Sequence, residues 1–272
     1  MGLNPIEYSP WQGSRSKHGQ RYLIIADRVF RGKMQGWTIA LIVLGFILVD
    51  LLNLILILVM PHEALTAEHM LSRFQAPIFF IFAIILVSLV CGDLIAEDLR
   101  SSSIVLYLSR ALRPSGYLLG KFAGASMVML SFTLLPAVVV ALAVMVTQSG
   151  SDYLASLGVI GQTILTGIWA AMLLLPLGIM MSSLTGRKHY AAVGTFMIAF
   201  VLEIIGGIFT EHDPNWYLIS PYGILSNTCQ AIFGQGLSPG IDPLLLAVMA
   251  FVFTVPPMLI AYYRIHLKGA GK

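Results

Sequence analysis

Charged residues are scarce in this sequence. It has 16 Lys and Arg and 13 Asp and Glu among 272 residues, or 11%, whereas an average globular chain carries about 25%. Hydrophobic residues make up 57% of the chain, and the mean hydropathy is +0.85. So few charges do not cover a soluble surface, and so much apolar character does not stay disordered. The composition therefore predicts a membrane protein.

Cysteine is also rare. Cys91 and Cys229 fall at opposite ends of predicted membrane spans, too far apart to pair within one chain. We therefore expect two free thiols, with a bridge between the Cys229 residues of two copies as the less favoured alternative. A secreted disulfide scaffold is excluded.

Catalytic motifs are missing as well. A phosphate-binding loop needs four residues between its glycines and Ser or Thr after its Lys. Only three separate Gly116 from Gly120, and Phe122 follows Lys121. Thr66 stands where a zinc helix beginning at His62 would need a second His. We therefore expect no enzyme activity, no cofactor bound by this chain and no nucleic-acid partner.

Long apolar runs are what the sequence has in abundance. A membrane helix needs about 20 apolar residues, and six runs reach that length. They are Trp37–Met60, Ala76–Ile95, Leu118–Val146, Ser156–Leu184, Tyr190–Phe209 and Pro243–Tyr263. Runs this long exclude short strands, so we predict an all-α membrane protein with six transmembrane helices. Residues 37–272 form the transmembrane domain, and residues 1–36 form a separate N-terminal segment.

The basic residues fall in alternate loops. Lys and Arg collect on the cytoplasmic side of membrane proteins, and 15 of the 16 here lie in one set of loops and tails. Only Arg73 lies in the other set. The exposed loops of that second set are acidic instead, with Glu63, Glu68, Asp152, Glu211, Asp213 and Asp242. Both termini are therefore predicted to be cytoplasmic.

Two segments outside the spans have mixed character. Within residues 1–36, apolar residues recur at three- and four-residue steps, at Tyr22, Ile25, Val29, Phe30, Met34 and Trp37. This pattern predicts an amphipathic helix along the inner interface, either as an anchor or also as a contact for a cytosolic partner. Residues 210–242 are rich in Pro, Trp and Tyr, which favour membrane interfaces. They predict short interfacial or re-entrant helices between spans five and six.

Two carboxylates lie deep inside predicted spans, near the middle of the bilayer, where charge is costly and often functional. Asp50 and Glu203 each lie about 20 Å along their helices at 1.5 Å per residue. Asn53 stands one turn from Asp50 and favours a structural polar pair there. For Glu203, lining a transport pathway and packing fit equally well.

Glycine pairs and outer polar residues complete the inventory. The pairs Gly120/Gly124 and Gly158/Gly161 predict close helix packing. Outer loops hold His62, Glu63, Glu68, His69, Glu211, His212 and Asp213. Their spacing matches no metal site, so we interpret them as solvated loop residues.

The connection between spans two and three carries the most specific pattern. Its elements are Glu97, Ser102-Ser103, Ile104–Leu108, Ser109-Arg110, Tyr117 and Gly120-Lys121. In this order they resemble the signature of type-2 ABC exporter permeases. The resemblance covers about 30 residues specifically, and the six-span layout extends it to the rest of the chain.

The resemblance implies a half-transporter subunit in a prokaryotic plasma membrane. It would pair with a second copy or a paralogue and with two cytosolic ATPase subunits, which would bind ATP and Mg²⁺. Residues 96–118 would form the coupling segment, with apolar Ile104, Leu106 and Leu108 in a groove of the ATPase. The charges expected to contact the ATPase are Glu97, Asp98, Arg100, Arg110 and Arg113.

Two other functions stay open. One is a self-sufficient secondary transporter or channel coupled through Asp50 and Glu203, although the inverted repeats typical of such proteins are not evident. The other is a non-transporting membrane anchor for an ATPase. The exporter hypothesis does not specify a substrate, which could be a lipid, a polysaccharide, a peptide, a drug or an ion.

Overall fold

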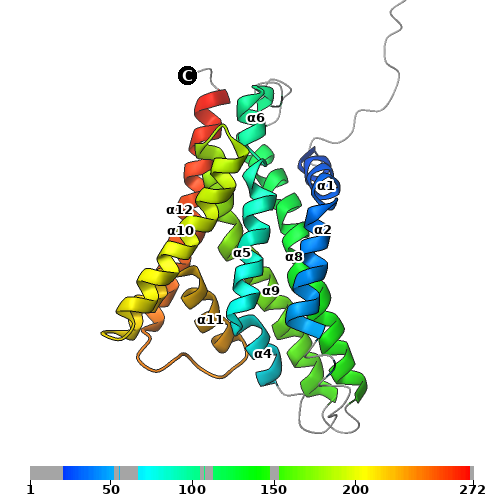
Figure 1. Cartoon of the computed structure of the whole chain (residues 1–272), viewed down its shortest axis with the longest axis vertical. Coiled ribbons are helices and arrows are strands. Elements are labelled where there is room, and N and C mark those ends of the chain that lie inside the picture. The colour runs from blue at the N-terminus through cyan, green and yellow to red at the C-terminus, as the bar shows by residue number, and fades with distance from the viewer. Residues whose placement is uncertain are drawn as a thin grey trace, which may run out of the picture.

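The helices of the protein run side by side as a bundle (Figure 1). The computed structural model describes residues 21–51, 55, 67–104, 107, 113–147 and 153–269, and all regular structure within them is helical. The helix α1 (Arg21–Lys33) lies at the same end of the bundle as the end of α12 (Pro243–Gly269). We call this the inner end, following the predicted orientation, and the opposite end the outer end.

The remaining elements follow in chain order. They are α2 (Trp37–Phe46), the π-helical turn η2 (Ile47–Leu51), α4 (Ala67–Gln75), α5 (Pro77–Gly92), α6 (Ala96–Arg100), α8 (Pro114–Thr147), α9 (Tyr153–Leu184), α10 (Lys188–Phe209), the 3-10 helix η3 (Pro214–Ile219) and α11 (Pro221–Ile232). Several of them begin with Pro. Proline is well tolerated there because a backbone N–H in the first turn would have no acceptor within the helix.

In the part of the chain that the structure describes, five helices are long and apolar enough to cross a membrane. They are Pro77–Arg100, Pro114–Leu135, Gly158–Leu184, Lys188–Phe209 and Pro243–Lys268. They coincide with the second to sixth predicted spans, so the all-helical, multi-pass character is confirmed.

The first predicted span is described to Leu51 and at residue 55, and the rest of its run lies outside the described residues. Its described part, Trp37–Leu51, is bent by 78° from Tyr22–Lys33. The sixth crossing stays a prediction.

The helix α9 forms the centre of the bundle. It packs against α8, α12, α5, α10 and α11, and its residues Ala170, Leu173 and Leu174 are fully buried. By contrast, α10 and α12 bury little of their apolar surface within the chain. In a membrane these two helices face lipid or another subunit.

Glycines set the distance between α1 and α8. A Cβ atom at Gly120 would lie 2.8 Å from the Tyr22 carbonyl oxygen, and one at Gly124 only 2.6 Å from Val29 Cβ. The prediction of close packing at this pair is confirmed. Within the chain it is wrong for Gly158 and Gly161, where an added Cβ would have no described neighbour within 4 Å.

The predicted apolar face of α1 packs mainly on the protein. Ile25, Val29, Phe30 and Met34 are half-buried against the core. Tyr22 and Trp37, which the periodicity also placed on that face, are 41% and 87% exposed. Gly36 precedes Trp37 with φ +58°, which turns the chain sharply between α1 and α2. The bend explains why Trp37 leaves the face.

Short helices form in the outer segment as the sequence predicted. η3 and α11 lie within residues 210–242, and α11 packs against α4. The Gln75 side-chain amide donates a 3.1 Å hydrogen bond to Ser226, and the Tyr222 hydroxyl donates to the Gln75 carbonyl oxygen. Trp169 of α9 donates a 2.8 Å bond to Thr228. We call α4, η3 and α11 together the outer cap.

The predicted orientation is testable by cysteine labelling, because both native cysteines are free and buried. Burial also raises the pKa of the Cys229 thiol to about 12, which suppresses its thiolate. The exposed residues Ser101 and Glu211 lie at the inner and outer ends. In intact cells, an impermeant maleimide is expected to label Glu211→Cys but not Ser101→Cys. After permeabilisation of the cells, it is expected to label both variants. Labelling of Ser101→Cys in intact cells would show that the predicted orientation in the membrane is reversed.

Candidate functional site

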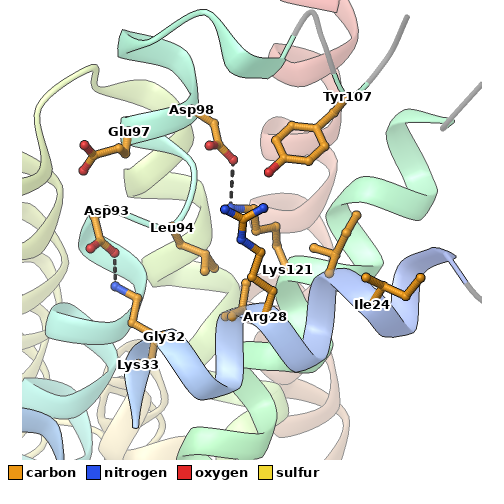
Figure 2. A pocket seen from close by; sticks show the side chains of 12 residues that line it. Ile24, Arg28, Gly32, Lys33, Asp93, Leu94, Glu97, Asp98, Tyr107 and Lys121 are labelled. Carbon is orange, nitrogen blue, oxygen red and sulfur yellow. Dashed lines mark hydrogen bonds and ion pairs between the residues drawn. The ribbon is translucent and has the colours of Figure 1, made fainter. Parts of the chain in front are cut away.

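A cavity of about 380 Å³ opens at the inner end, between α1, the turn after α5, α6 and the start of α8 (Figure 2). It combines apolar and charged walls. It is lined by Ile24, Ile25, Arg28, Val29, Gly32, Lys33, Asp93, Leu94, Glu97, Asp98, Tyr107 and Lys121. Asp93 and Leu94 lie in the turn between α5 and α6, and Tyr107 lies beyond α6. The other lining residues come from α1, α6 and α8, which the glycine contacts and ion pairs hold in place.

The turn between α5 and α6 is fixed by one hydroxyl of α9. Ser182 Oγ accepts hydrogen bonds from the backbone N–H groups of Ile95 at 2.9 Å and Ala96 at 3.1 Å. It donates in turn to the Gly92 carbonyl oxygen at 3.4 Å. Free N–H groups at the start of a helix need such an acceptor. Ser182 supplies it from a distant part of the chain, so α6 is anchored to the bundle centre.

Asp98 joins α6 to α8. Its carboxylate accepts a hydrogen bond from the buried Tyr117 hydroxyl and another from Ser103 at 2.9 Å. Lys121 Nζ lies 2.8 Å from the same carboxylate and 5.5 Å from the centre of the Tyr117 ring. These partners satisfy the Asp98 charge within the chain.

A second ion pair joins α1 to the end of α5. Lys33 Nζ contacts the Asp93 carboxylate, and both side chains are partly shielded from solvent. Figure 2 shows this pair and the Asp98–Lys121 pair on two sides of the cavity. The inner ends of α1, α5, α6 and α8 are therefore connected by charge as well as by packing.

Two further charges line the cavity without such a partner. Neither Arg28 of α1 nor Glu97 of α6 forms an ion pair with any described residue. Both side chains are exposed. They give the cavity one cation and one carboxylate that no described residue neutralises.

The predicted coupling residues have different surroundings. Glu97, Arg100 and Arg113 are exposed, whereas Asp98 is engaged inside the chain. Ile104 is only 2% exposed and belongs to the core, so it does not offer the free apolar surface expected of it. Leu106, Leu108 and Arg110 lie outside the described residues.

Asp50 has a partner that the sequence interpretation did not assign. Its carboxylate accepts hydrogen bonds from Arg73 Nε and, at 3.2 Å, from Arg73 Nη2. Both side chains are 1% exposed. The guanidinium carbon also lies 4.8 Å from the ring centre of Phe74 and 5.1 Å from that of Phe79. The lone basic residue of the outer loops is thus a buried ion-pair partner, and Asn53 lies outside the described residues.

Glu203 faces the outer cap. It is half-buried on α10, with Tyr217, Ser220 and Tyr222 close to its carboxyl group. Its Oε2 atom is buried and accepts no hydrogen bond from a described residue. One turn later, Gly206 lies against the backbone of the cap. A role in lining a pathway stays a prediction.

The outer His and acidic residues do not gather around a metal in the part of the chain that the structure describes. There, no group of three or more His, Cys, Asp or Glu is placed to hold an ion. His62 and Glu63 lie outside that part.

The chain was compared with known proteins. No family model matches it, and no curated protein matches it. The likeness to type-2 ABC exporter permeases therefore rests on residues 92–121 and on the span layout.

Sequence reasoning missed Arg28, Lys33, Asp93 and Ser182 as members of the inner site. Asp93 carried a usable signal, because a carboxylate at the very end of an apolar run needs a partner or water. The other three carried none, because nothing local distinguishes them from ordinary residues of an inner helix.

Proposed function

We propose that this chain is the membrane-spanning subunit of an ATP-driven exporter, and that α6 and the residues after it receive the movement of a cytosolic ATPase. The observation that carries the proposal is the connection of α6 to several helices at once. Ser182 holds it to α9, Asp98 holds it to α8, and a short turn joins it to α5. A push on α6 is thereby transmitted to these spans as a rigid-body movement.

The outward surface of this segment suits a docking role. Glu97, Arg100 and Arg113 are exposed there, next to the exposed Ser101 and Ser102. Ser102 has φ +54°, an unfavourable conformation for a residue with a side chain. Such strain persists where the surrounding structure enforces it, and it is common at contact sites.

The proposal assigns the remaining parts of the complex to partners. Two ATPase subunits bind ATP and Mg²⁺, and this chain binds neither. A second copy or a paralogue pairs with it in a prokaryotic plasma membrane, for which the open apolar faces of α10 and α12 leave room. The substrate path runs between the two membrane subunits.

Ion-coupled transport through Asp50 is less favoured. The Asp50 carboxylate is held by Arg73, so protonating it would leave a buried guanidinium without its counter-charge. That cost opposes a cycle in which Asp50 repeatedly gains and loses a proton.

The test uses charge reversal at the exposed surface of the segment. The double variant Arg100→Glu and Arg113→Glu is expected to retain about tenfold less of the ATPase that co-purifies with the wild-type chain, because rim charges would repel instead of attract. Stimulation of ATP hydrolysis should fall with retention. The measurement is quantitative co-purification from native membranes in mild detergent.

The matched control is Lys268→Glu, an exposed charge reversal on α12 at the same end. It should retain the ATPase at the wild-type level. Equal retention by the double variant would exclude this segment as the docking site. A wild-type chain that retains no ATPase would exclude the exporter proposal itself.

A further inference from the structure

The inner cavity separates its charges. Glu97 lies one helical turn from Asp93, since its N–H donates to the Asp93 carbonyl oxygen. In Figure 2 both carboxylates lie on the same side of the cavity as Lys33, which pairs with Asp93. In the view of Figure 2, Arg28 points toward Asp98 on the other side, where Lys121 already pairs with that carboxylate. One side therefore has an excess negative charge and the other an excess positive charge.

The mouth of the cavity is apolar and adjoins the predicted membrane interface. Ile24 lines the cavity and is 63% exposed, and its neighbour Leu23 is also exposed. Trp37, the first residue of α2 after the bend that follows α1, is also exposed. Exposed aromatic and apolar residues beside charged ones are typical of helices at the headgroup level of a bilayer.

We propose that this cavity binds the phosphoethanolamine headgroup of an aminophospholipid of the inner leaflet. Arg28 would bind the phosphate, because its planar guanidinium donates two parallel hydrogen bonds to phosphate oxygens. Glu97 would accept hydrogen bonds from the primary ammonium group. The acyl chains would leave past Ile24 and Leu23 into the bilayer.

The volume of the cavity and the charges of its lining residues both restrict which lipid headgroup fits. A volume of about 380 Å³ is at the small end of ligand sites, which span about 300–1,000 Å³, and it suits a headgroup rather than a whole lipid. A quaternary choline has no N–H to donate to Glu97. An anionic glycerol headgroup would leave Glu97 unpaired beside Asp93. The bound lipid would brace α1 against α6, whether or not the chain is an exporter subunit.

The experiment is native mass spectrometry of the full-length chain in detergent, titrated with dioleoyl phosphatidylethanolamine, phosphatidylcholine or phosphatidylglycerol. The wild-type chain is expected to bind the ethanolamine lipid about tenfold more tightly than the other two, as for one charged hydrogen bond. Glu97→Gln should remove the preference for ethanolamine over choline. Arg28→Gln should weaken both lipids about tenfold and leave their ratio unchanged.

The control is Arg31→Gln on the same helix, where Arg31 pairs with Asp27 on the exposed surface outside the cavity. It should bind lipid like the wild type. Glu97→Asp keeps the carboxylate and should restore most of the binding. Arg28→Lys keeps the charge but not the two parallel hydrogen bonds, so it should restore part of it. Both variants separate lost recognition from lost folding.

Several results would overturn the proposal. They are equal wild-type affinity for the three lipids, tighter binding of phosphatidylglycerol, or equal weakening by Arg31→Gln. A competition experiment with soluble phosphoethanolamine distinguishes a lipid from a free small molecule as the ligand. If phosphoethanolamine displaces the lipid at an affinity equal to the lipid's own, the site recognises a free metabolite rather than a membrane component, and the lipid assignment is wrong.

Discussion

Replacement of Arg73 by Met is expected to destabilise the protein by about 3–5 kcal/mol, the usual cost of leaving one partner of a buried ion pair alone. Met keeps much of the volume but leaves the Asp50 carboxylate uncompensated inside the bundle. Both side chains are 1% exposed, so water does not reach the orphaned charge. The measurement is the unfolding free energy of the chain in bicelles by steric trapping.

A second variant identifies the cause. Adding Asp50→Asn to Arg73→Met removes both charges, and most of the lost stability should return, because paired removal avoids the orphaned ion. Arg31→Met, which breaks an exposed ion pair with Asp27, should change stability by no more than about 0.5 kcal/mol. A double variant as unstable as Arg73→Met alone would show that packing of Arg73 on Phe74 and Phe79, rather than its charge, holds this region together.

Gly124→Ala is expected to displace α1 from α8. The new Cβ would lie 2.6 Å from Val29 Cβ and 2.7 Å from the Ala26 carbonyl oxygen. The second contact is with backbone, so rotation of a side chain does not relieve it and the whole helix must move. Overpacking of this kind costs about 1–3 kcal/mol, which is enough to undock a helix held on one face.

Limited trypsin digestion in detergent measures the displacement, because α1 contains Arg28, Arg31 and Lys33. Cleavage within α1 should become several-fold faster in Gly124→Ala. Gly116→Ala is the matched control on the same helix, since no described residue lies within 4 Å of a Cβ placed there. Equal cleavage of the two variants would contradict close packing at Gly124.

The sequence predicted the spans well because the membrane imposes a length. A bilayer core requires about 20 apolar residues in one helix. Each apolar run meets this requirement by itself, so it can be recognised without knowing the rest of the structure. Charge at the ends of the runs fixed their limits to within a few residues. The two short helices within residues 210–242 were also predictable, because Pro214 starts η3 and Pro221 starts α11. The helix α4 of the outer cap was not predicted.

The polar pairs were not predictable because their partners are distant in sequence. Asp50 and Arg73 are 23 residues apart, and Lys33 and Asp93 are 60 apart. Which carboxylate meets which cation depends on the rotation of each helix about its axis, which local periodicity does not determine. The same limit explains the opposite outcomes at Gly124 and Gly161, since the spacing of glycines does not say whether another helix lies against them.

The pairing of Asp50 with Arg73 also bears on how the protein responds to membrane voltage. Carrying one elementary charge across a potential of 100 mV involves about 2.3 kcal/mol, but an ion pair that moves as a unit carries no net charge. In the predicted orientation the outer loops hold no other Lys or Arg. The membrane potential therefore acts on no unpaired Lys or Arg there. Within the predicted spans, Glu203 is the outer-half carboxylate without a cationic partner among the described residues, so we expect any voltage sensitivity of the spans there to depend on it.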